Sequence, residues 1–178
     1  MKRLFSFLTA LVLISVFSID AFAQGTDNDA MTATASVIAP VNVTAGTTLD
    51  FGEVVPNVNK TVNVSGSGND ADVAIGDFTV TGETGNTVQL SFTALNDLTD
   101  GGSNTLTIDY NNTNYAAYFP SSGSYAIDGT DFNPSSSTPT VTLVGGSVDV
   151  LIGGEAQPGA SQAGGTYTGT ITLTATYN

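Results

Sequence analysis

Three short polar segments carry oxygen side chains at spacings that could bind a calcium ion. They are Asn69–Asp72, Asp97–Asp100 and Asp128–Asp131. Calcium takes several oxygen ligands from loops, and the candidate ligands are Asp97, Asp100, Asp128 and Asp131. Aspartate and asparagine also form ordinary turns, because their side chains hydrogen-bond the nearby backbone. None of the segments has the spacing of a known calcium loop, so we predict turns and no bound metal or cofactor.

The sequence contains neither histidine nor cysteine. A Ser-His-Asp triad, a thiol nucleophile and a zinc site with the usual ligands are therefore excluded. Two carboxylates about 5–10 Å apart could still hydrolyse a glycosidic bond, but the acidic residues lie in no recognisable motif. We therefore predict that the protein is not an enzyme.

The first residues have the three parts of a secretory signal peptide. Met1-Lys2-Arg3 is basic, Leu4 to Ile19 is apolar, and Ala21-Phe22-Ala23 is a cleavage site of the small-x-small type. We expect residues 1–23 to be removed, leaving no membrane span. The mature chain is then expected to pass through the periplasm and to reach the cell surface or the extracellular space.

The expected mature chain is strongly acidic. Two of the three basic residues and one of the 16 carboxylates lie before residue 24, so Lys60 alone remains against fifteen carboxylates. Such a chain is repelled by phosphate backbones and by anionic headgroups. We therefore expect neither nucleic-acid binding nor peripheral membrane binding.

Apolar and polar residues alternate along most of the chain. This alternation predicts strands, and the candidate calcium ligands would lie in the loops between them. In the closing segment, every even position from Thr166 to Thr176 is threonine, and the odd positions from Tyr167 to Tyr177 could face a core. A period of two is typical of a strand. About nine or ten such strands with glycine turns predict one domain, residues 24–178, with an antiparallel immunoglobulin-like β-sandwich and Greek-key connections. A closed barrel is the alternative.

Two pairs of alternating segments are expected to form hairpins. Residues 78–80 precede a glycine-containing turn and the segment 88–94. Residues 141–143 and 148–150 flank Gly145-Gly146. A two-residue glycine turn would place the four apolar residues of the second pair on one face.

The N-terminal part of the expected mature chain also alternates, from Met31 to Val43. This pattern predicts a long strand or two collinear strands. Pro40 has no N–H group, so it marks an edge, a bulge or a switch between sheets. Residues 24–36 are a possible N-terminal extension of the domain.

Three segments near the two ends of the mature chain form a recognisable set. They are Leu49-Asp50-Phe51-Gly52, the late pair Gly145-Gly146, and a closing strand with Gly165-Thr166-Tyr167-Thr168-Gly169 and Tyr177. In these segments the chain resembles a family of small secreted bacterial β-sandwich proteins of unassigned function, which is similar to spore-coat-U-type domains and to chaperone-usher pilins. Pilins carry a penultimate tyrosine and a glycine fourteenth from the C-terminus, and Tyr177 and Gly165 match both.

The resemblance to pilins implies an incomplete sandwich whose groove is filled by the N-terminal strand of the next subunit. The implied partners are further copies or related subunits, a periplasmic assembly chaperone and an usher. The residues implied to contact the chaperone or a neighbouring subunit are Gly165, Tyr167, Ile171, Leu173 and Tyr177. The implied donor residues are Met31, Ala33, Ala35 and Val37.

The function predicted from this resemblance is that of a secreted structural or adhesive surface protein, a fimbria-like fibre subunit assembled by strand exchange. The alternative is a monomeric secreted binding module for carbohydrate or calcium, which would use the loops 97–104 and 111–139. In that alternative the domain is self-complete, and residues 33–43 pair within their own sheet.

Overall fold

The computed structural model describes residues 26–178, and the predicted signal peptide, residues 1–23, lies outside them. The chain divides into two units, residues 1–36 and residues 37–178. In the first unit, residues 26–36 form neither helix nor strand and are exposed to solvent. The second unit is called the domain below. Within residues 26–178, no helix is long and apolar enough to span a membrane.

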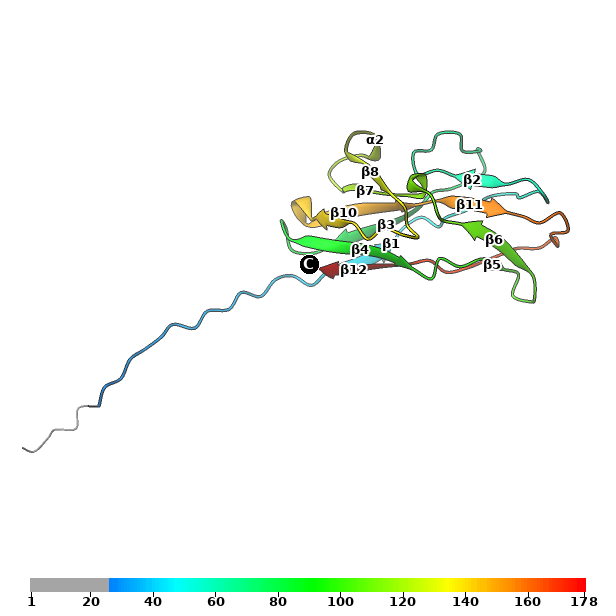
Figure 1. Ribbon diagram of the computed structural model, residues 1–178. Helices are drawn as coiled ribbons and strands as arrows, with labels where there is room; N and C mark the ends of the chain where they lie inside the picture. The colour runs from blue at the N-terminus through cyan, green and yellow to red at the C-terminus, as the bar shows by residue number, and fades with distance from the viewer. Residues whose placement is uncertain (1–25) are drawn as a thin grey trace, which may run out of the picture. The chain divides into compact units, whose positions relative to one another are not determined.

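The regular secondary structure of the domain consists mainly of short antiparallel strands, which confirms the expected all-β fold (Figure 1). Its three helical turns are η1 (Thr113–Tyr115), α2 (Tyr125–Asp128) and η2 (Val144–Gly146). The strands are β1 (Asn42–Ala45), β2 (Lys60–Val62), β3 (Gly76–Thr81), β4 (Thr87–Thr93), β5 (Leu98–Thr99), β6 (Thr105–Asp109), β7 (Ala116–Pro120), β8 (Thr130–Phe132), β9 (Thr140–Thr142), β10 (Ser147–Ile152), β11 (Gly154–Gln157) and β12 (Thr172–Tyr177).

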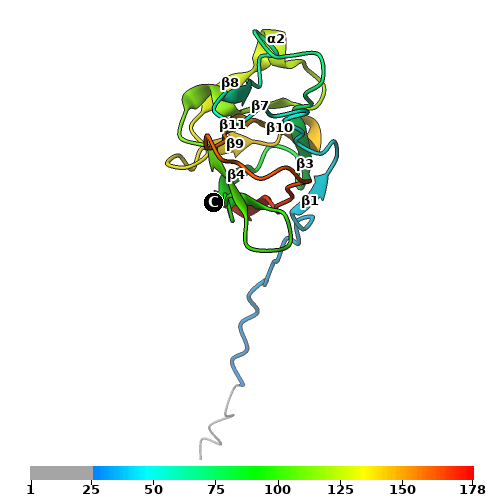
Figure 2. The same ribbon diagram turned by 90° about the vertical axis from the view of Figure 1, so that its right-hand side faces the viewer.

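The strands form three antiparallel sheets, with the orders β1-β3-β10-β7-β8, β2-β11-β6-β5 and β12-β4-β9. Seen end-on, they enclose the core, and β12 lies between β4 and β1 (Figure 2). Strand β12 is hydrogen-bonded to β4 over its whole length, from Thr172 opposite Thr93 to Tyr177 opposite Val88. It contacts β1 without forming a ladder with it.

A glycine joins two of these sheets. Gly153 lies between β10 and β11, so that one stretch of chain belongs first to one sheet and then to the next. Its N–H group donates a 2.8 Å hydrogen bond to the carbonyl oxygen of Tyr115. A Cβ atom at this position would collide with the carbonyl oxygen of Val62, so the close approach of two backbones requires glycine here.

The alternation of the sequence determines which side chains are buried. In β12, Leu173 is buried, whereas the threonines at 172, 174 and 176 are exposed. Burying a Val, Leu or Ile side chain contributes about 1.5–3 kcal/mol, so a core of this kind can stabilise a domain that has no disulfide. Its largest fully buried side chains are Leu90, Leu143, Ile152, Val62, Val80, Val88, Val148 and Val150.

Both expected hairpins are wrong. Strand β3 pairs with β1 and β10, whereas β4 pairs with β9 and β12, and β9 does not pair with β10. The two turns are instead neighbouring connections between sheets. Gly82 donates to the carbonyl oxygen of Gly146, and Gly85 donates to that of Leu143, both at 2.9 Å. Gly145 and Gly146 have φ of 68° and 83°, so the turn needs glycine even though it closes no hairpin.

The two terminal strands are shorter than their patterns predict. Within the alternating segment 31–43, strand structure begins only at Asn42, after Pro40, whose nitrogen cannot donate to a ladder. At the other end, β12 begins at Thr172 rather than at 166. Before it, Thr168 forms an isolated antiparallel bridge with Thr99.

Candidate strand-binding groove

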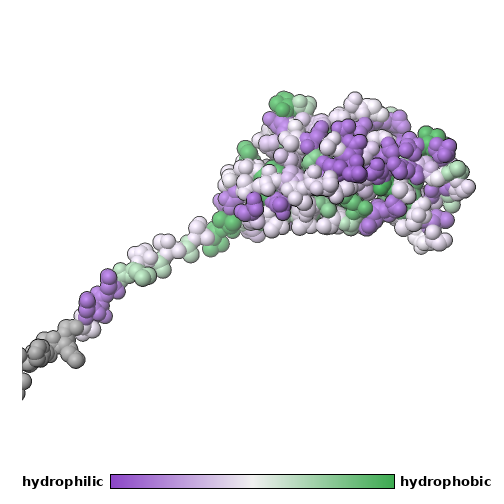
Figure 3. Space-filling model, viewed as in Figure 1, coloured by the Kyte–Doolittle hydropathy of each residue, from purple (hydrophilic) through white to green (hydrophobic). Residues whose placement is uncertain are grey.

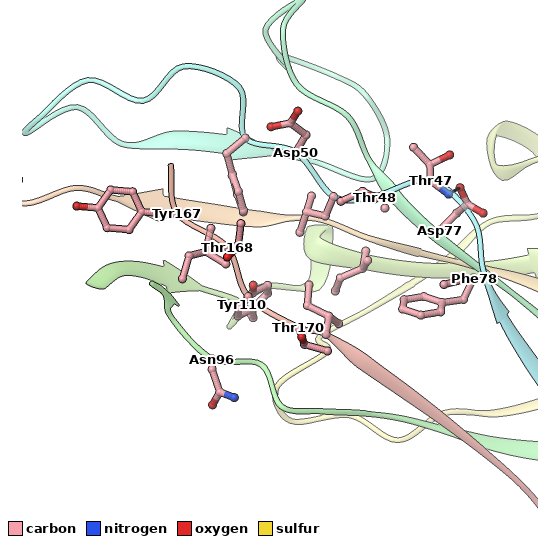
Figure 4. A pocket seen from close by; sticks show the side chains of 18 of the residues that line it. Thr47, Thr48, Asp50, Asp77, Phe78, Asn96, Tyr110, Tyr167, Thr168 and Thr170 are labelled. Atoms are coloured by element: carbon pink, nitrogen blue, oxygen red, sulfur yellow. Dashed lines mark hydrogen bonds between the residues drawn. The ribbon is translucent and has the colours of Figure 1, made fainter. Parts of the chain in front are cut away.

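A cavity of about 490 Å³ opens between two segments that are far apart in the sequence (Figure 4). One wall is residues 45–51, which end β1 and continue beyond it. The other wall is residues 166–171, which lead into β12 and are called the arm below. Side chains of the core form the floor of the cavity, namely Leu49, Phe78, Leu98, Tyr110 and Ile152.

A second hollow of about 540 Å³ continues the first. It lies between residues 49–56 and residues 162–167, and the two hollows share residues 49–51 and 166–167 of their walls. Together they form one elongated depression, called the groove below.

On the face of the domain that Figure 3 shows, exposed hydrophobic residues lie among hydrophilic ones.

The first wall presents an unpaired main-chain edge to the groove. Asp50 and Ala74 exchange two hydrogen bonds of 2.9 Å each. In an antiparallel bridge of this kind, the main-chain groups of the flanking residues point to the opposite side. Those of Leu49 and Phe51 therefore point away from Ala74, toward the groove.

The arm presents a second edge. Thr168 donates to the carbonyl oxygen of Thr99 at 2.8 Å and accepts from its N–H group at 2.9 Å. The main-chain groups of Tyr167 and Gly169 therefore point away from Thr99 and toward the groove. Within the described residues, no hydrogen bond joins the two walls. The groove thus separates two strand edges that lack a strand between them.

A tyrosine fixes the arm independently of the first wall. The Tyr167 hydroxyl accepts a 2.8 Å hydrogen bond from Nε2 of Gln162 and donates one of 2.7 Å to the carbonyl oxygen of Ala163. The same Nε2 also donates to the carbonyl oxygen of Thr105 in β6, at 3.0 Å. The arm is thereby tied to β6, so the groove can remain open.

The floor contains a buried hydroxyl without a partner. Tyr110 is 3% exposed, and its hydroxyl forms no hydrogen bond with any residue in the described part of the chain. Burial, together with the negative charge of Asp97, raises the pKa of this hydroxyl to about 12. The ring packs against Gly154, where a Cβ atom would lie 3.2 Å from two of the ring carbons.

The predicted interaction residues divide between the groove and the rest of β12. Gly165, Tyr167 and Ile171 line the groove. Leu173 is buried in the core, opposite Phe92 of β4. Three of the five residues implied by the resemblance to pilins are therefore positioned to contact something bound in the groove.

The fifth residue, Tyr177, lies at the other end of β12. Its hydroxyl accepts a 2.6 Å hydrogen bond from the N–H group of Glu83 and donates one of 2.7 Å to the carbonyl oxygen of Ala39. The N–H group of Ala39 in turn donates to the Glu83 carboxylate at 3.0 Å. Tyr177 therefore fixes the point at which the chain enters the domain.

The four predicted donor residues belong to no sheet. Met31, Ala33 and Ala35 lie in the exposed segment 26–36, and Val37 is the first residue of the domain. Met31 and Val37 are 92% and 95% exposed. Apolar side chains of this segment are thus available for contact with another surface.

Both carboxylates of the first pair of calcium candidates accept hydrogen bonds from the domain. Asp97 accepts from the N–H group of Ile108 at 3.0 Å. Asp100 accepts from the N–H group of Gly102 at 2.8 Å and from Nδ2 of Asn104 at 2.6 Å. The hydrogen bond from Asn104, together with that from Gly102, holds the pKa of Asp100 below its usual value. The contacts of Asp100 are those of a turn-forming side chain, whereas Asp97 bonds to the main chain of β6.

The second pair is also engaged locally. Asp128 accepts from the N–H group of Ser124 at 3.3 Å, and Asp131 accepts from the Tyr125 hydroxyl at 2.8 Å. Across residues 26–178, no three His, Cys, Asp or Glu side chains are grouped so that they could hold a metal ion.

Sequence reasoning missed the floor and the first wall. Tyr110 shares a strand face with Leu106 and Ile108, so its pattern predicts an ordinary core residue. Leu49-Asp50-Phe51-Gly52 was recognised as a family feature, but its unpaired edge depends on the distant bridge to Ala74. Neither role has a local signal in the sequence.

Fold and groove together define an antiparallel β-sandwich with a depression between two unpaired strand edges. The chain belongs to the family described as "Domain of unknown function (DUF4402)", which matches residues 41–177. The matched region contains both walls of the groove, Tyr110 and the closing strand. No curated protein matches the chain.

Proposed function

We propose that this protein is a secreted structural subunit of a surface fibre, assembled by strand exchange. The observation that carries the proposal is the pair of unpaired edges on either side of a largely apolar floor. An extended segment inserted between them could hydrogen-bond to Leu49 and Phe51 on one side and to Tyr167 and Gly169 on the other. Main-chain bonds of this type give strand addition its affinity, and alternate side chains set its register.

The inserted segment is the N-terminal extension of another copy, with Met31, Ala33, Ala35 and Val37 facing the floor. Two of these side chains are small and bury little apolar area. The floor already holds the large side chains of Phe78, Tyr110 and Ile152, so a shallow groove has room for alanine. The segment 31–37 would span about 20 Å as a strand.

The entry point of the chain favours insertion into a second copy. Ala39 is held by Tyr177, at the end of β12 that lies away from the arm. Strand β12 is six residues long, which corresponds to about 20 Å. The groove lies at the opposite end of β12 from this entry point, so we assign the inserted segment to the groove of a second copy.

The free edges also need protection before assembly, because an exposed strand edge is a template for wrong pairing. A periplasmic chaperone that adds its own strand to the groove would contact Gly165, Tyr167 and Ile171. Release of that strand at an usher would then allow the next subunit to insert. This role follows from the resemblance to pilins together with the position of these residues on the groove.

The test is to express the protein with its genomic neighbours and to examine cell-surface extracts on a denaturing gel, with and without heating. Fibres held by strand exchange are expected to give a ladder of multimers that collapses to one band on heating. A single monomer band in every extract would contradict the proposal and would favour a monomeric binding module.

A further inference from the structure

A turn formed by residues 55–58 exposes two valines at the end of the groove. Val55 and Val58 are 60% and 57% exposed. The N–H group of Val58 donates a 3.1 Å hydrogen bond to the carbonyl oxygen of Val55, and Asn57, which follows Pro56, has a φ of 62°. Proline followed by a residue with positive φ is typical of a type II turn, whose first and last Cα atoms lie within about 7 Å. The two valines thus form one small apolar surface, called the valine turn below.

The valine turn is held in place by the main chain. The N–H group of Asn57 donates a 3.2 Å hydrogen bond to the carbonyl oxygen of Pro158, which directly follows β11. Val55 lines the second hollow of the groove, whereas Val58 lines neither hollow. The turn therefore extends the apolar surface beyond the groove itself.

The N-terminal segment enters the domain at the opposite end. Tyr177 holds Ala39 there and also bonds to Glu83. Strand β10 begins at this end, opposite Thr81, and β10 and β11 then lead along the domain to Pro158. The entry point and the valine turn therefore lie at the two ends of the domain (Figure 1).

The connection between the proposed donor residues and their own domain is short. Val37 is the last donor residue, and Ala39 is already fixed by Tyr177. Two residues of extended chain span about 7 Å. A copy whose segment fills a groove must therefore lie directly against the end of the groove at which the segment leaves.

The groove has one end at which a segment can leave. Toward β12 the walls come together, because β1 and β12 contact each other. At the other end the walls are the loop residues 52–56 and 162–165, which form no strand. The segment therefore leaves past the valine turn, and the entry end of the inserting copy comes to lie there.

We propose that the valine turn is a contact surface between subunits, and that it binds the entry end of the copy whose segment 31–37 fills the groove. This inference rests on the proposed function. The entry end carries exposed apolar side chains of its own. Ile38 is 44% exposed, and Val144, in the turn that accepts a hydrogen bond from Gly82, is 52% exposed.

This contact supplies apolar burial that the donor segment lacks. Ala33 and Ala35 bury little area in the groove, whereas valine and isoleucine side chains bury more. The two contacting surfaces lie at opposite ends of one domain, so the contact joins copies head to tail. Such a contact repeats without pairing a surface with itself, which is the geometry of an open fibre.

Sedimentation velocity of the full mature chain over a concentration series measures the association between copies. The variants are Val58→Ser and Ile38→Ser, and the control is Ile127→Ser. The control removes an isoleucine that is 85% exposed on α2, on the other side of the domain from β12 (Figures 1 and 2). We expect each variant to associate about tenfold more weakly than the wild type, as for the loss of a partly buried apolar side chain, and the control to associate as the wild type does. Val58→Ile, which keeps the apolar surface, should also associate as the wild type does.

A labelled synthetic peptide, residues 27–37, separates this contact from strand insertion. The peptide contains the donor residues without Ile38 and without a domain. Its binding to the mature chain is measured by fluorescence anisotropy, at a chain concentration at which the copies do not associate. The wild type and Val58→Ser should bind the peptide equally well.

The outcomes distinguish the two proposals. If the wild type fails to bind the peptide, the groove is not a strand acceptor and the proposed function fails. If the wild type binds the peptide but Val58→Ser associates as strongly as the wild type does, strand insertion stands and the role of the valine turn is overturned. An equal loss of association in Ile127→Ser, or weaker peptide binding by Val58→Ser, would overturn that role as well.

Discussion

The hydroxyl of Tyr177 donates a 2.7 Å hydrogen bond to the carbonyl oxygen of Ala39, so the next-to-last residue of the chain holds the point at which the N-terminal segment enters the domain. The same hydroxyl accepts from the N–H group of Glu83, and the Glu83 carboxylate accepts from that of Ala39. Three distant parts of the sequence meet in this network. It fixes the base of the proposed donor strand, while the groove lies at the other end of β12.

Removing the Tyr177 hydroxyl should destabilise the domain. In Tyr177→Phe, the N–H group of Glu83, which lies in a partly buried bond, loses its acceptor, and the expected cost is about 1–3 kcal/mol. Urea unfolding followed by circular dichroism measures the free energy of unfolding. Tyr118→Phe is the matched control, and an equal effect of the two substitutions would show that the network contributes nothing.

Deleting residues 24–36 from the mature chain should leave a folded domain that does not self-associate. These residues lie outside the domain, and residues 26–36 form no helix or strand. Circular dichroism should show an unchanged sheet spectrum, and size-exclusion chromatography should show a monomer where the full mature chain forms larger species. Loss of folding on deletion would refute the assignment of a donor strand.

A pH dependence is expected from the pair formed by Lys60 and Asp72. Nζ of Lys60 lies 2.6 Å from a carboxylate oxygen of Asp72. This hydrogen bond, supported by the N–H group of Glu53, holds the pKa of Asp72 below its usual value of 3.8. Because the pKa is lower in the folded state than in the unfolded chain, the stabilisation is present above the unfolded pKa and is lost as the pH falls through the folded one.

The corresponding measurement compares the urea midpoints of wild type and Asp72→Asn as the pH is lowered. The wild type should be the more stable protein at neutral pH, and the difference should shrink below about pH 4. Asp27→Asn, in the exposed N-terminal segment, serves as the control. A difference that persists unchanged in acid would mean that the charge of Asp72 is not its cause.

Gly153→Ala should destabilise the domain by about 1–3 kcal/mol or more, as overpacking does. The added methyl group would collide with the carbonyl oxygen of Val62, at the point where β10 continues into β11. Gly159→Ala is the matched control, because no atom lies within 4 Å of the position that its Cβ would occupy. Thermal unfolding of the two variants should show a lowered midpoint for Gly153→Ala alone.

The fold class could be predicted from the sequence because alternation is a local property. The threonine face and the apolar face of β12 can be recognised from neighbouring residues alone, and the structure has Leu173 buried and Thr174 exposed. The choice of partner strand is not local. Gly145-Gly146 has the composition of a hairpin turn, yet the chain passes at this turn from one sheet to another. The neighbouring connection, residues 82–85, donates hydrogen bonds to this turn.

The same difference between local and non-local information applies to the candidate site. Gly165, Tyr167 and Ile171 could be proposed from a resemblance that concerns the end of the chain, and all three line the groove. Tyr110 could not, because an unpartnered hydroxyl exists only once the surrounding strands are in place. Its sequence pattern is the same as that of any core residue in β6.

Cysteine cross-linking between two copies tests strand exchange most directly, since the native sequence contains no cysteine. One copy carries Thr170→Cys on the arm, and the other carries a single cysteine at one of the positions from 31 to 37. A disulfide forms only where two Cα atoms come within about 7 Å. The yield of linked dimer should alternate along the donor segment, high at one or more of Thr32, Thr34 and Ser36 and low at Ala33 and Ala35, whose side chains would face the floor. Equal yields at all seven positions, or no linked dimer at any of them, would contradict insertion of this segment into the groove.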